Sequence, residues 1–203
     1  MYKMAYYSGQ DRKEVISFMK EHTFAMVTGM GDKYPVASQL PLEIIEEDEK
    51  LLLTGHLMCK TDHHVAFAKN ENVLVIFHSP HAYIHASWYG NPAQASTVNY
   101  MAVHAKGKIS FTDEAGTFEA IKALTDKQLG TNSPGSFNNI PKDYIDGMLK
   151  AIVGFTIEVE SLENVFKLSQ NRNPEDQQKI IIELEKKNEP GSDFIAKQMK
   201  ERL

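Results

Sequence analysis

The sequence feature that most constrains the fold is a series of short apolar stretches separated by turns, with few helices between them. Strands are predicted over residues 24–28, 35–45, 51–57, 73–77, 81–89, 98–111, 153–159 and 165–168. Pro41 makes the second of these an edge strand or a bulge. Strands that alternate with helices are typical of parallel sheets, so this direct succession favours an antiparallel barrel or sandwich. We therefore predict a mainly β fold with peripheral helices.

The helices are predicted from caps and apolar periodicity around these strands. Their predicted caps or first residues are Asp11, Thr61 or Asp62, Thr112 and Pro141. Asn173-Pro174 has the pattern of a helix N-cap followed by the first helical position. We expect C-terminal helices from about residue 173, within a single domain spanning residues 1–203.

Charge and cysteine content narrow the partners and the compartment. The 203 residues carry a net charge of −5 without a cluster of Lys and Arg, so direct nucleic-acid binding is not expected. The single cysteine, Cys59, excludes an internal disulfide and suits a reducing compartment. No segment approaches the roughly 18 apolar residues of a membrane span. The N-terminal residues also lack an apolar core of signal-peptide length. We expect a cytoplasmic protein that is not bound to membrane.

The first stretch that could carry chemistry is Leu53–Phe67, where a strand ends in a turn and enters a helix. The turn holds Thr54, His56 and Lys60. A helix N-terminus offers backbone N–H groups and a positive dipole end, and an added hydroxyl and cation would hold a phosphate. The alternative interpretation is a strand-to-helix turn with exposed polar residues. His63-His64 is interpreted as solvated helix surface.

The second stretch, His78–Tyr89, is rich in histidine and aromatic residues. In a strand, His81, Tyr83 and His85 share one face. Strand spacing could bring two imidazoles to one zinc, but no carboxylate or second cysteine is nearby in sequence, so no metal site is predicted. These side chains are better interpreted as lining a ligand mouth or a subunit contact.

The third stretch, Lys167–Arg172, reads KLSQNR and is dense in hydrogen-bond donors at a strand end before a capped helix. It is interpreted either as an anion or cofactor edge or as a capping loop. The sequence has no GxGxxG, P-loop, GxSxG or HExxH motif, so the catalytic residues are unknown.

These stretches together resemble the PaiB-type FMN-binding negative transcriptional regulators, a family of the flavin split-barrel superfamily related to pyridoxamine-phosphate oxidases. The segments that carry the resemblance are Ser38–Leu42, Thr54–His56, Pro80–Ile84, Ser87–Tyr89, Asn99-Tyr100, Val103-His104, Gly107, Ile152–Phe155 and Lys167–Arg172. They run from the second strand to near the C-terminus. The resemblance implies an antiparallel FMN-binding split β-barrel.

The resemblance also implies a homodimer with FMN near the subunit interface, and a phosphate-binding turn that aligns with Thr54 to Lys60. The oxidases often have an Arg at a position that falls near Ser38 or Gln39 in this sequence, so that cation is absent here. Phosphate affinity would then depend more on Lys60, His56 and backbone amides. The family commonly has Trp where Val98 stands here. The implied cofactor-binding residues are Ser38, Gln39, Leu40, Pro41, Thr54, Gly55, His56, Lys60, Ser87, Trp88, Asn99, Tyr100, Lys167, Ser169, Gln170, Asn171 and Arg172. The aromatic face expected to be covered in the dimer comprises Tyr83, Trp88, Tyr89 and Tyr100.

Three functions stay open at this point. The first is a PaiB-type FMN-binding regulatory protein, whose effect on transcription would be indirect because there is no helix-turn-helix signal and no basic stripe. The second is a flavin-dependent oxidoreductase acting on a small metabolite, in which the isoalloxazine carries the redox step. No residue stands out as an essential acid or base for such a reaction, although His56, His81, His85 and Tyr83 are available. The third is a haem-binding or haem-degrading split barrel, for which no single histidine stands out as the axial ligand.

Overall fold

The computed structural model describes residues 4–8 and 11–203. The chain forms two compact units, and each is described by itself. Unit 1 comprises residues 1–18, 77–103 and 163–203, and unit 2 comprises residues 19–76 and 104–162. Three strands, β5 (Asn72–His78), β7 (Thr97–Phe111) and β8 (Ile152–Lys167), contribute residues to both units.

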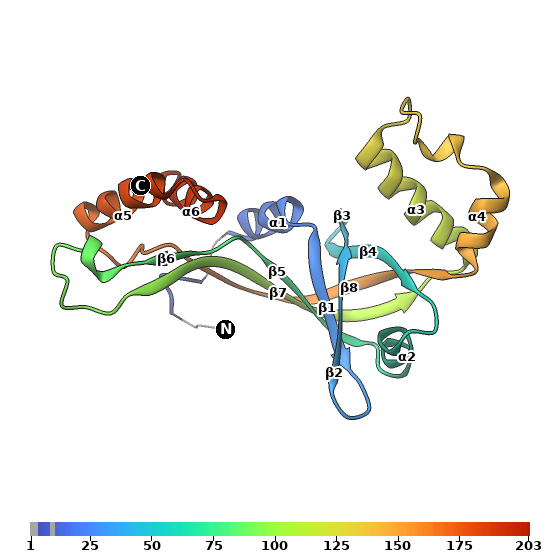
Figure 1. The fold of residues 1–203 in the computed structure, drawn as a ribbon. Helices are drawn as coiled ribbons and strands as arrows, with labels where there is room; N and C mark the ends of the chain where they lie inside the picture. The colour runs from blue at the N-terminus through green and yellow to red at the C-terminus, as the bar shows by residue number, and fades with distance from the viewer. Residues whose placement is uncertain (1–3, 9–10) are drawn as a thin grey trace. The chain divides into compact units, whose positions relative to one another are not determined.

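Most of the described strands join one sheet (Figure 1). The remaining strands are β1 (Phe24–Met30), β2 (Pro35–Pro41), β3 (Glu43–Glu47), β4 (Lys50–Met58) and β6 (Ala82–Ile84). In the described residues the sheet order is β2-β1-β5-β7-β8-β4-β3, and β6 pairs with β7. Every pairing whose register is described is antiparallel. The prediction of a mainly β antiparallel fold with helices is confirmed.

Three predicted strand boundaries were wrong. The predicted strand over 35–45 is two strands that part at Leu42, which is buried and whose N–H donates to the Thr23 carbonyl oxygen at 2.9 Å. The residues before Leu42, in β2, pair with β1, and those after it, in β3, pair with β4. The predicted strands over 153–159 and 165–168 are one continuous strand, β8. The stretch 81–89 holds only the short β6 and a 3-10 turn, η1 (Ala86–Trp88), because the Ala86 N–H bonds the Ser96 hydroxyl instead of a neighbouring strand.

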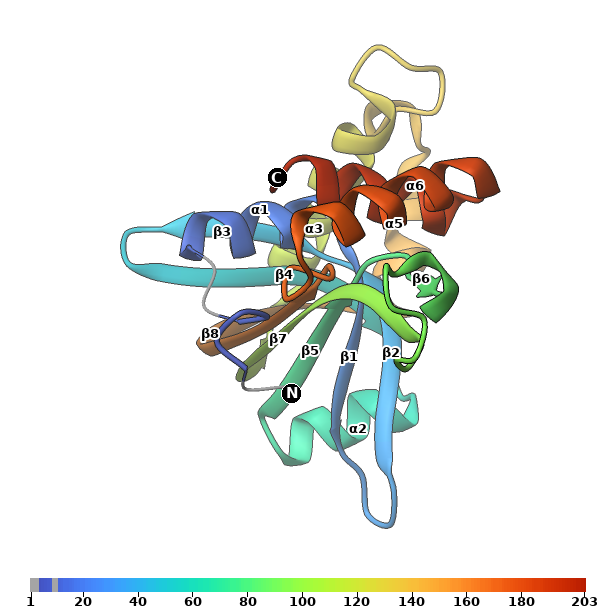
Figure 2. The same ribbon diagram turned by 90° about the vertical axis from the view of Figure 1, so that its left-hand side faces the viewer.

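In unit 2, the period-two pattern of β1 places small apolar side chains inward. Ala25 and Val27 are fully buried, whereas Phe24 and Met30 are exposed. Helix α2 (Asp62–Lys69) contacts both β1 and β2 (Figure 2). A Cβ on Gly29 would lie 2.8 Å from the Phe67 ring, so a glycine is needed there for the helix to approach the strand.

The segment between β7 and β8 adds helices α3 (Glu114–Leu129) and α4 (Lys142–Leu149) and a 3-10 turn, η2 (Phe137–Asn139). They share a small core of Ile121, Phe137 and Ile145, and α3 contacts β4. The predicted cap was one residue early: Asp113, not Thr112, caps α3 by accepting from the Gly116 N–H at 2.8 Å. Pro141 is the N-cap of α4, in agreement with the prediction.

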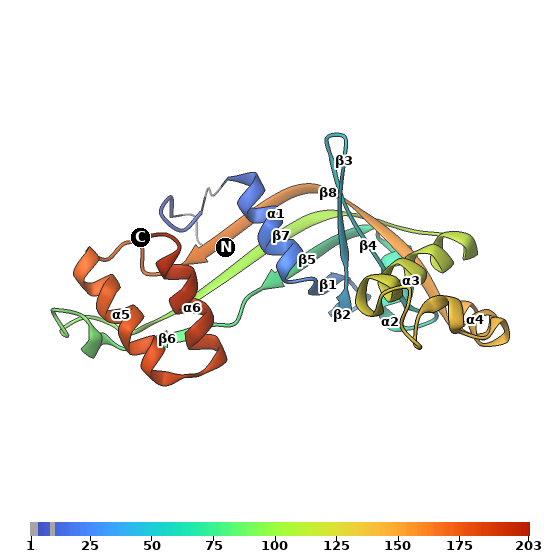
Figure 3. The same cartoon turned by 90° about the horizontal axis from the view of Figure 1, so that it is seen from above.

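In unit 1, helices α5 (Pro174–Lys187) and α6 (Pro190–Lys200) lie side by side (Figure 3). Asn173 caps α5 by accepting from the Asp176 N–H at 2.8 Å, as the Asn-Pro pattern predicts. The buried side chains of the pair are mainly Ile180, Ile181, Leu184, Ile195 and Met199. A Cβ on Gly191 would lie 2.4 Å from the His81 carbonyl oxygen, so α6 comes close to the β6 backbone.

Helix α1 (Arg12–Glu21) begins in unit 1 and ends in unit 2. Its Phe18 ring lies 5.1 Å from the Phe166 ring, both within unit 1. Through residues 4–8 and 11–203, no helix has the length and apolar character needed to cross a membrane.

Candidate functional site

The predicted cofactor-binding residues fall into two sets, one in each unit. The turn group, in unit 2, comprises Ser38, Gln39, Leu40, Pro41, Thr54, Gly55, His56 and Lys60. The loop group, in unit 1, comprises Ser87, Trp88, Asn99, Tyr100, Lys167, Ser169, Gln170, Asn171 and Arg172. The members of each set therefore lie within one unit.

In the turn group, residues 38–41 lie on β2, which ends the strand order of the sheet. An edge strand leaves a row of backbone N–H and C=O groups without a strand partner. This edge approaches β4, since a Cβ on Gly55 would lie 3.2 Å from the Pro41 carbonyl oxygen. Gly55 thus allows the end of β2 and the middle of β4 to come close together.

The polar residues of β4 flank Gly55. Thr54 lies opposite Glu43 of β3 and Thr156 of β8, and His56 lies opposite Gly154. Thr54 and His56 are half-buried and share one strand face, opposite to the buried Leu53 and Leu57. Burial lowers the pKa of the His56 imidazole below its ordinary value of 6.5, so this ring is neutral at neutral pH. Among the described residues, no hydrogen bond engages either of its ring nitrogens.

Lys60 lies between β4 and α2 in the left-handed region, with φ of 63°. Its side chain is exposed, and no described residue pairs with its ammonium group. The expectation that the backbone N–H groups at this helix start are unpaired was wrong in part. The Lys60 N–H donates to His64 Nδ1 at 2.9 Å, the His63 N–H to Asp62 Oδ1 at 2.8 Å, and the His64 N–H to the Thr61 hydroxyl at 3.4 Å.

The two histidines that follow are not solvated helix surface, contrary to the prediction. Both are half-buried. The His64 ring packs edge-on against Phe111 with centroids 4.8 Å apart, and His63 Nε2 lies 2.9 Å from the Thr61 hydroxyl. They cap and support the turn, a role that their spacing in the sequence does not reveal.

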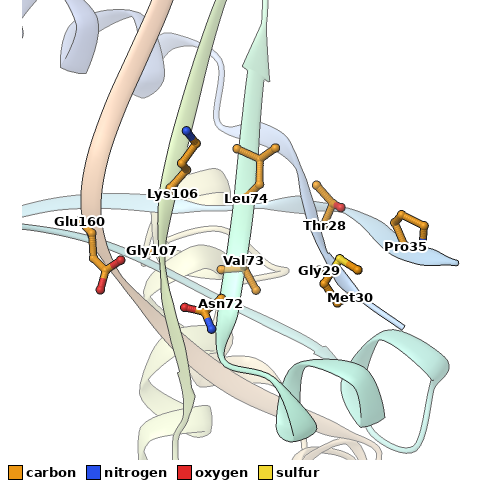
Figure 4. A pocket seen from close by; sticks show the side chains of 10 residues that line it. All are labelled: Thr28, Gly29, Met30, Pro35, Asn72, Val73, Leu74, Lys106, Gly107 and Glu160. Atoms are coloured by element: carbon orange, nitrogen blue, oxygen red, sulfur yellow. The ribbon is translucent and has the colours of Figure 1, made fainter. Parts of the chain in front are cut away.

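An open groove of about 440 Å³ lies on the sheet in unit 2 (Figure 4). Its lining residues come from five strands and are Thr28, Gly29, Met30, Pro35, Asn72, Val73, Leu74, Lys106, Gly107 and Glu160. Apolar side chains dominate this lining, with one cation and one carboxylate added by Lys106 and Glu160. The sequence prediction missed the groove, because its residues are neighbours only through strand pairing.

In the loop group, a buried pair fixes the end of β8. Ser169 has φ of 60° and is 3% exposed. Its hydroxyl accepts from Asn99 Nδ2 at 2.9 Å and lies 3.2 Å from Asn99 Oδ1. Gln170 closes the turn, because its side chain accepts from the Leu168 N–H and donates to the Phe166 carbonyl oxygen. Asn99, Ser169 and Gln170 therefore satisfy one another and the backbone.

Lys167, the last residue of β8, and Arg172, in the loop that follows, each contact uncharged groups. The Lys167 ammonium donates to the Thr97 hydroxyl and lies 6.0 Å from the Tyr7 ring centroid. The Arg172 guanidinium donates to the Gln94 side-chain oxygen and stacks 4.3 Å over the Tyr89 ring. Burial first, and the Arg172 charge second, lower the pKa of the Lys167 ammonium. These partners were not predicted, because residues 94–97 lie in a polar stretch without periodicity.

Of the remaining members of the loop group, Ser87 and Trp88 lie in η1, Tyr100 lies on β7, and Asn171 lies in the loop after β8. Ser87 and Asn171 are exposed, and Trp88 and Tyr100 are half-buried. Lys187 stands 5.4 Å over the Trp88 ring, which lies 4.9 Å from the His85 ring.

The expected exposed aromatic face needs a correction. Tyr83 is 49% exposed but Tyr89 only 4%, so Tyr89 does not belong to it. Within residues 4–8 and 11–203, no three His, Cys, Asp or Glu side chains gather as metal ligands.

Comparisons with solved structures support the fold. The "FAD and Heme binding protein" of Mycobacterium smegmatis has a TM-score of 0.62 at 13% identity, over 85% of this chain and 78% of that chain. The "Flavocytochrome Anf3" of Azotobacter vinelandii has a TM-score of 0.63 at 13% identity, over 88% and 78%. At such identities the likeness concerns the fold alone, and it confirms the predicted split barrel.

Comparisons of sequence identify the family. The family model described as "Putative FMN-binding domain" matches residues 1–161. The "Protease synthase and sporulation protein PAI 2" of Bacillus subtilis (strain 168) is 32% identical over 204 residues, covering 100% of this chain and 98% of that protein. Because the model matches most of the chain and this relative aligns along all of it, the chain belongs to the "Putative FMN-binding domain" family and is a full-length homologue of PAI 2.

Proposed function

We propose that this protein binds FMN through the turn group and holds the flavin phosphate with Lys60, Thr54 and His56. The observation that carries the proposal is Lys60: an exposed cation, unpaired among the described residues, within the segment that the FMN-binding family model matches. The loop from Lys167 to Arg172 lies beyond residue 161, outside that match. This favours the turn group as the phosphate end.

The residues of the turn group suit a phosphate through their side chains. Lys60 supplies a charge, Thr54 a hydroxyl, and the neutral His56 ring a donor that no described residue uses. The backbone amides of Lys60, His63 and His64 already donate within the turn. The helix N-terminus therefore contributes less than its position suggests, and the three side chains supply most of the affinity.

The edge of β2 would face the polar edge of the flavin ring. Residues 38–41 offer backbone donors and acceptors at the end of the strand order. FMN, when bound, supplies redox chemistry that side chains lack. The protein's own part is to bind and orient the flavin, and no residue is assigned as a catalytic acid or base.

The biological role that we propose is regulatory, of the PaiB type, in the cytoplasm. The lone Cys59 suits a reducing compartment. A net charge of −5 makes direct binding to DNA unfavourable, so an effect on transcription would act through another molecule. A specific nanomolar mobility shift of a promoter fragment at physiological salt would contradict this role.

We also propose a symmetric homodimer. Tyr83 is exposed, and Trp88 and Tyr100 are half-buried. A two-fold contact would cover such side chains. Light scattering at micromolar concentration should give about twice the 22.9 kDa mass of the chain, and a monomer mass would reject the proposal.

FMN and riboflavin, titrated separately into the protein and followed by quenching of flavin fluorescence, test the proposed function. The two ligands differ only in the phosphate. We expect FMN to bind at least tenfold more tightly, and the purified protein with FMN to show flavin absorption bands. Equal affinities would reject a phosphate site, and a Soret band in place of flavin bands would favour haem. Turnover of a metabolite by the loaded protein would make it an oxidoreductase instead.

A further inference from the structure

The further inference concerns an open pocket of about 380 Å³ in the segment between β7 and β8, within unit 2 (Figure 1). Its walls come from α3, η2 and α4, and none of the residues proposed above for FMN belongs to it. Small-molecule sites in proteins usually have volumes of roughly 300–1,000 Å³. The pocket is therefore large enough for a small organic molecule.

Half of the residues that line this pocket are apolar, namely Phe118, Phe137, Ile140 and Ile145. The Phe118 and Phe137 rings meet edge to face, with centroids 5.1 Å apart. Phe137 and Ile145 are buried, whereas Phe118 is only half-buried. A half-buried ring leaves aromatic surface for a further ring or an aliphatic chain. The pocket therefore offers a contact surface to the apolar part of a ligand.

The other lining residues are polar, and two of them carry charges without a described partner. Lys142 and Asp146 lie one helical turn apart on α4. In the described part of the chain, neither side chain forms a hydrogen bond or an ion pair, with the other or with a third residue. Lys122 differs, because its ammonium lies 3.5 Å from the Asp126 carboxylate, and Asn138 adds an uncharged amide. The pocket thus presents one cation and one carboxylate to a ligand.

The walls of the pocket are packed against the rest of unit 2. The Thr117 hydroxyl, next to Phe118 on α3, accepts from the Gly154 N–H of β8 at 2.8 Å, and Thr117 is 2% exposed. On α4, Ile145 belongs to the small core that it shares with Ile121 of α3. Walls that are already packed lose little conformational entropy when a ligand binds.

We propose that this pocket binds a free α-amino acid with a large apolar side chain. A zwitterion matches both charges, with its carboxylate at Lys142 and its ammonium group at Asp146. A plain carboxylic acid would instead bring a second negative charge close to Asp146, and a plain amine would bring a second positive charge close to Lys142. The apolar side chain of the amino acid packs against Phe118. The site does not depend on FMN binding at the turn group.

Isothermal titration calorimetry of the full-length protein with three ligands tests the proposal. L-phenylalanine carries both charges, 3-phenylpropionate lacks the ammonium group, and phenethylamine lacks the carboxylate. We expect saturable binding of L-phenylalanine that is about fivefold tighter than the binding of either analogue, which is the upper end for exposed ion pairs. Equal affinities for the three ligands would overturn the proposal.

Two substitutions assign the charges. Lys142→Gln should weaken L-phenylalanine about fivefold without weakening phenethylamine, and Asp146→Asn should weaken L-phenylalanine about fivefold without weakening 3-phenylpropionate. The matched controls are Asp143→Asn and Lys150→Gln, which make the same charge changes on α4 and at its C-cap but outside the pocket. We expect the controls to bind all three ligands like wild type.

Absence of saturable L-phenylalanine binding, or an equal loss in the controls and in the two pocket variants, would also overturn the proposal. All four substitutions replace exposed side chains, so the fold should survive, and circular dichroism checks that it does. Lys60→Gln separates this proposal from the FMN site. That variant should bind L-phenylalanine like wild type whether or not it binds FMN. If it loses L-phenylalanine, the amino acid occupies the turn group and the proposed pocket is wrong.

Discussion

Both the β4–α2 turn and the β8–α5 loop take the chain from a strand into a helix through a residue with positive φ. In the first that residue is the exposed Lys60, with φ of 63°, and in the second it is the buried Ser169, with φ of 60°. The described bonds of Lys60, His63 and His64 reach four residues at most along the chain. Those of Ser169 reach Asn99, 70 residues away.

The difference separates a turn with an exposed cation from a loop with a buried serine. The Lys60 side chain is exposed. The long-range contacts of this turn are made by its neighbours, the Cys59 N–H with the Ala151 carbonyl oxygen and the His64 ring with Phe111. Lys60 can therefore change without disturbing the core, and its cation is available to a ligand. A loop held by a buried pair is part of the core, and its serine and glutamine are used by the fold itself. A segment rich in hydrogen-bond donors can therefore present an exposed side chain, as at Lys60, or bury a side chain in the core, as at Ser169. The folded contacts distinguish these two cases.

The largest effect is expected from Asn99→Ala. It removes the buried partner of Ser169 and leaves that hydroxyl without a hydrogen bond, at a cost of about 2–3 kcal/mol. Urea denaturation measures the loss, with exposed Asn171→Ala in the same loop as the control, for which we expect less than about 0.5 kcal/mol. Similar small effects for both variants would mean that the pair does not hold the loop.

Substitution by glycine at the two positive-φ residues should have opposite signs. Lys60→Gly relieves a left-handed conformation that disfavours side chains, and should stabilise the fold by about 0.5–1 kcal/mol. Ser169→Gly gains the same relief but loses the buried hydroxyl, with a net loss of about 1 kcal/mol. Thermal unfolding of the two variants checks the signs, and a loss in both would show that the turn at Lys60 is also held by its side chain.

The two helix caps provide a smaller comparison. Asn173 accepts from the Asp176 N–H at 2.8 Å and also donates to the Asp176 carboxylate, whereas Thr61 accepts from the His64 N–H at a long 3.4 Å. We expect Asn173→Ala to cost about 1–2 kcal/mol and Thr61→Ala about 0.5 kcal/mol. Calorimetric unfolding that ranks the two in reverse would contradict this reading of the caps.

The smallest effect concerns pH and His56. Burial lowers the pKa of its imidazole, so the unfolded state binds more protons than the folded state below pH 6.5. The contribution of the neutral ring to stability is present above this pH and is lost as pH falls through the lowered value. His56→Gln should flatten that part of the stability profile, measured by urea denaturation between pH 7.5 and 5. An unchanged slope would exclude His56 as its source.

Much of the fold could be predicted because alternating apolar residues define strands over a few positions. The limits appear where a strand changes partner, as at Leu42, since local sequence does not state which strand lies alongside. The polar residues between 160 and 164 also led to the prediction of two strands where β8 is one. A strand with one solvent-exposed face can contain polar residues without ending.

The candidate site was predicted by resemblance more than by pattern. Thr54, His56 and Lys60 could be proposed from the sequence because they lie in one segment of seven residues. The partners of Arg172 and Ser169 were not found, because Gln94 and Asn99 are 78 and 70 residues away in sequence. No local periodicity carries such contacts, so the structural part of the KLSQNR loop emerges only from the folded chain.

The measurement that tests the central claim most directly is an FMN titration of wild type, Lys60→Ala and Arg172→Ala, followed by quenching of flavin fluorescence. A charge-assisted hydrogen bond to phosphate contributes about 1.5–3 kcal/mol, so Lys60→Ala should weaken FMN by about 10- to 150-fold while riboflavin affinity stays the same. Arg172→Ala should bind FMN like wild type. If instead Lys60→Ala binds like wild type and Arg172→Ala does not, the flavin phosphate lies in unit 1 and the proposed site is wrong.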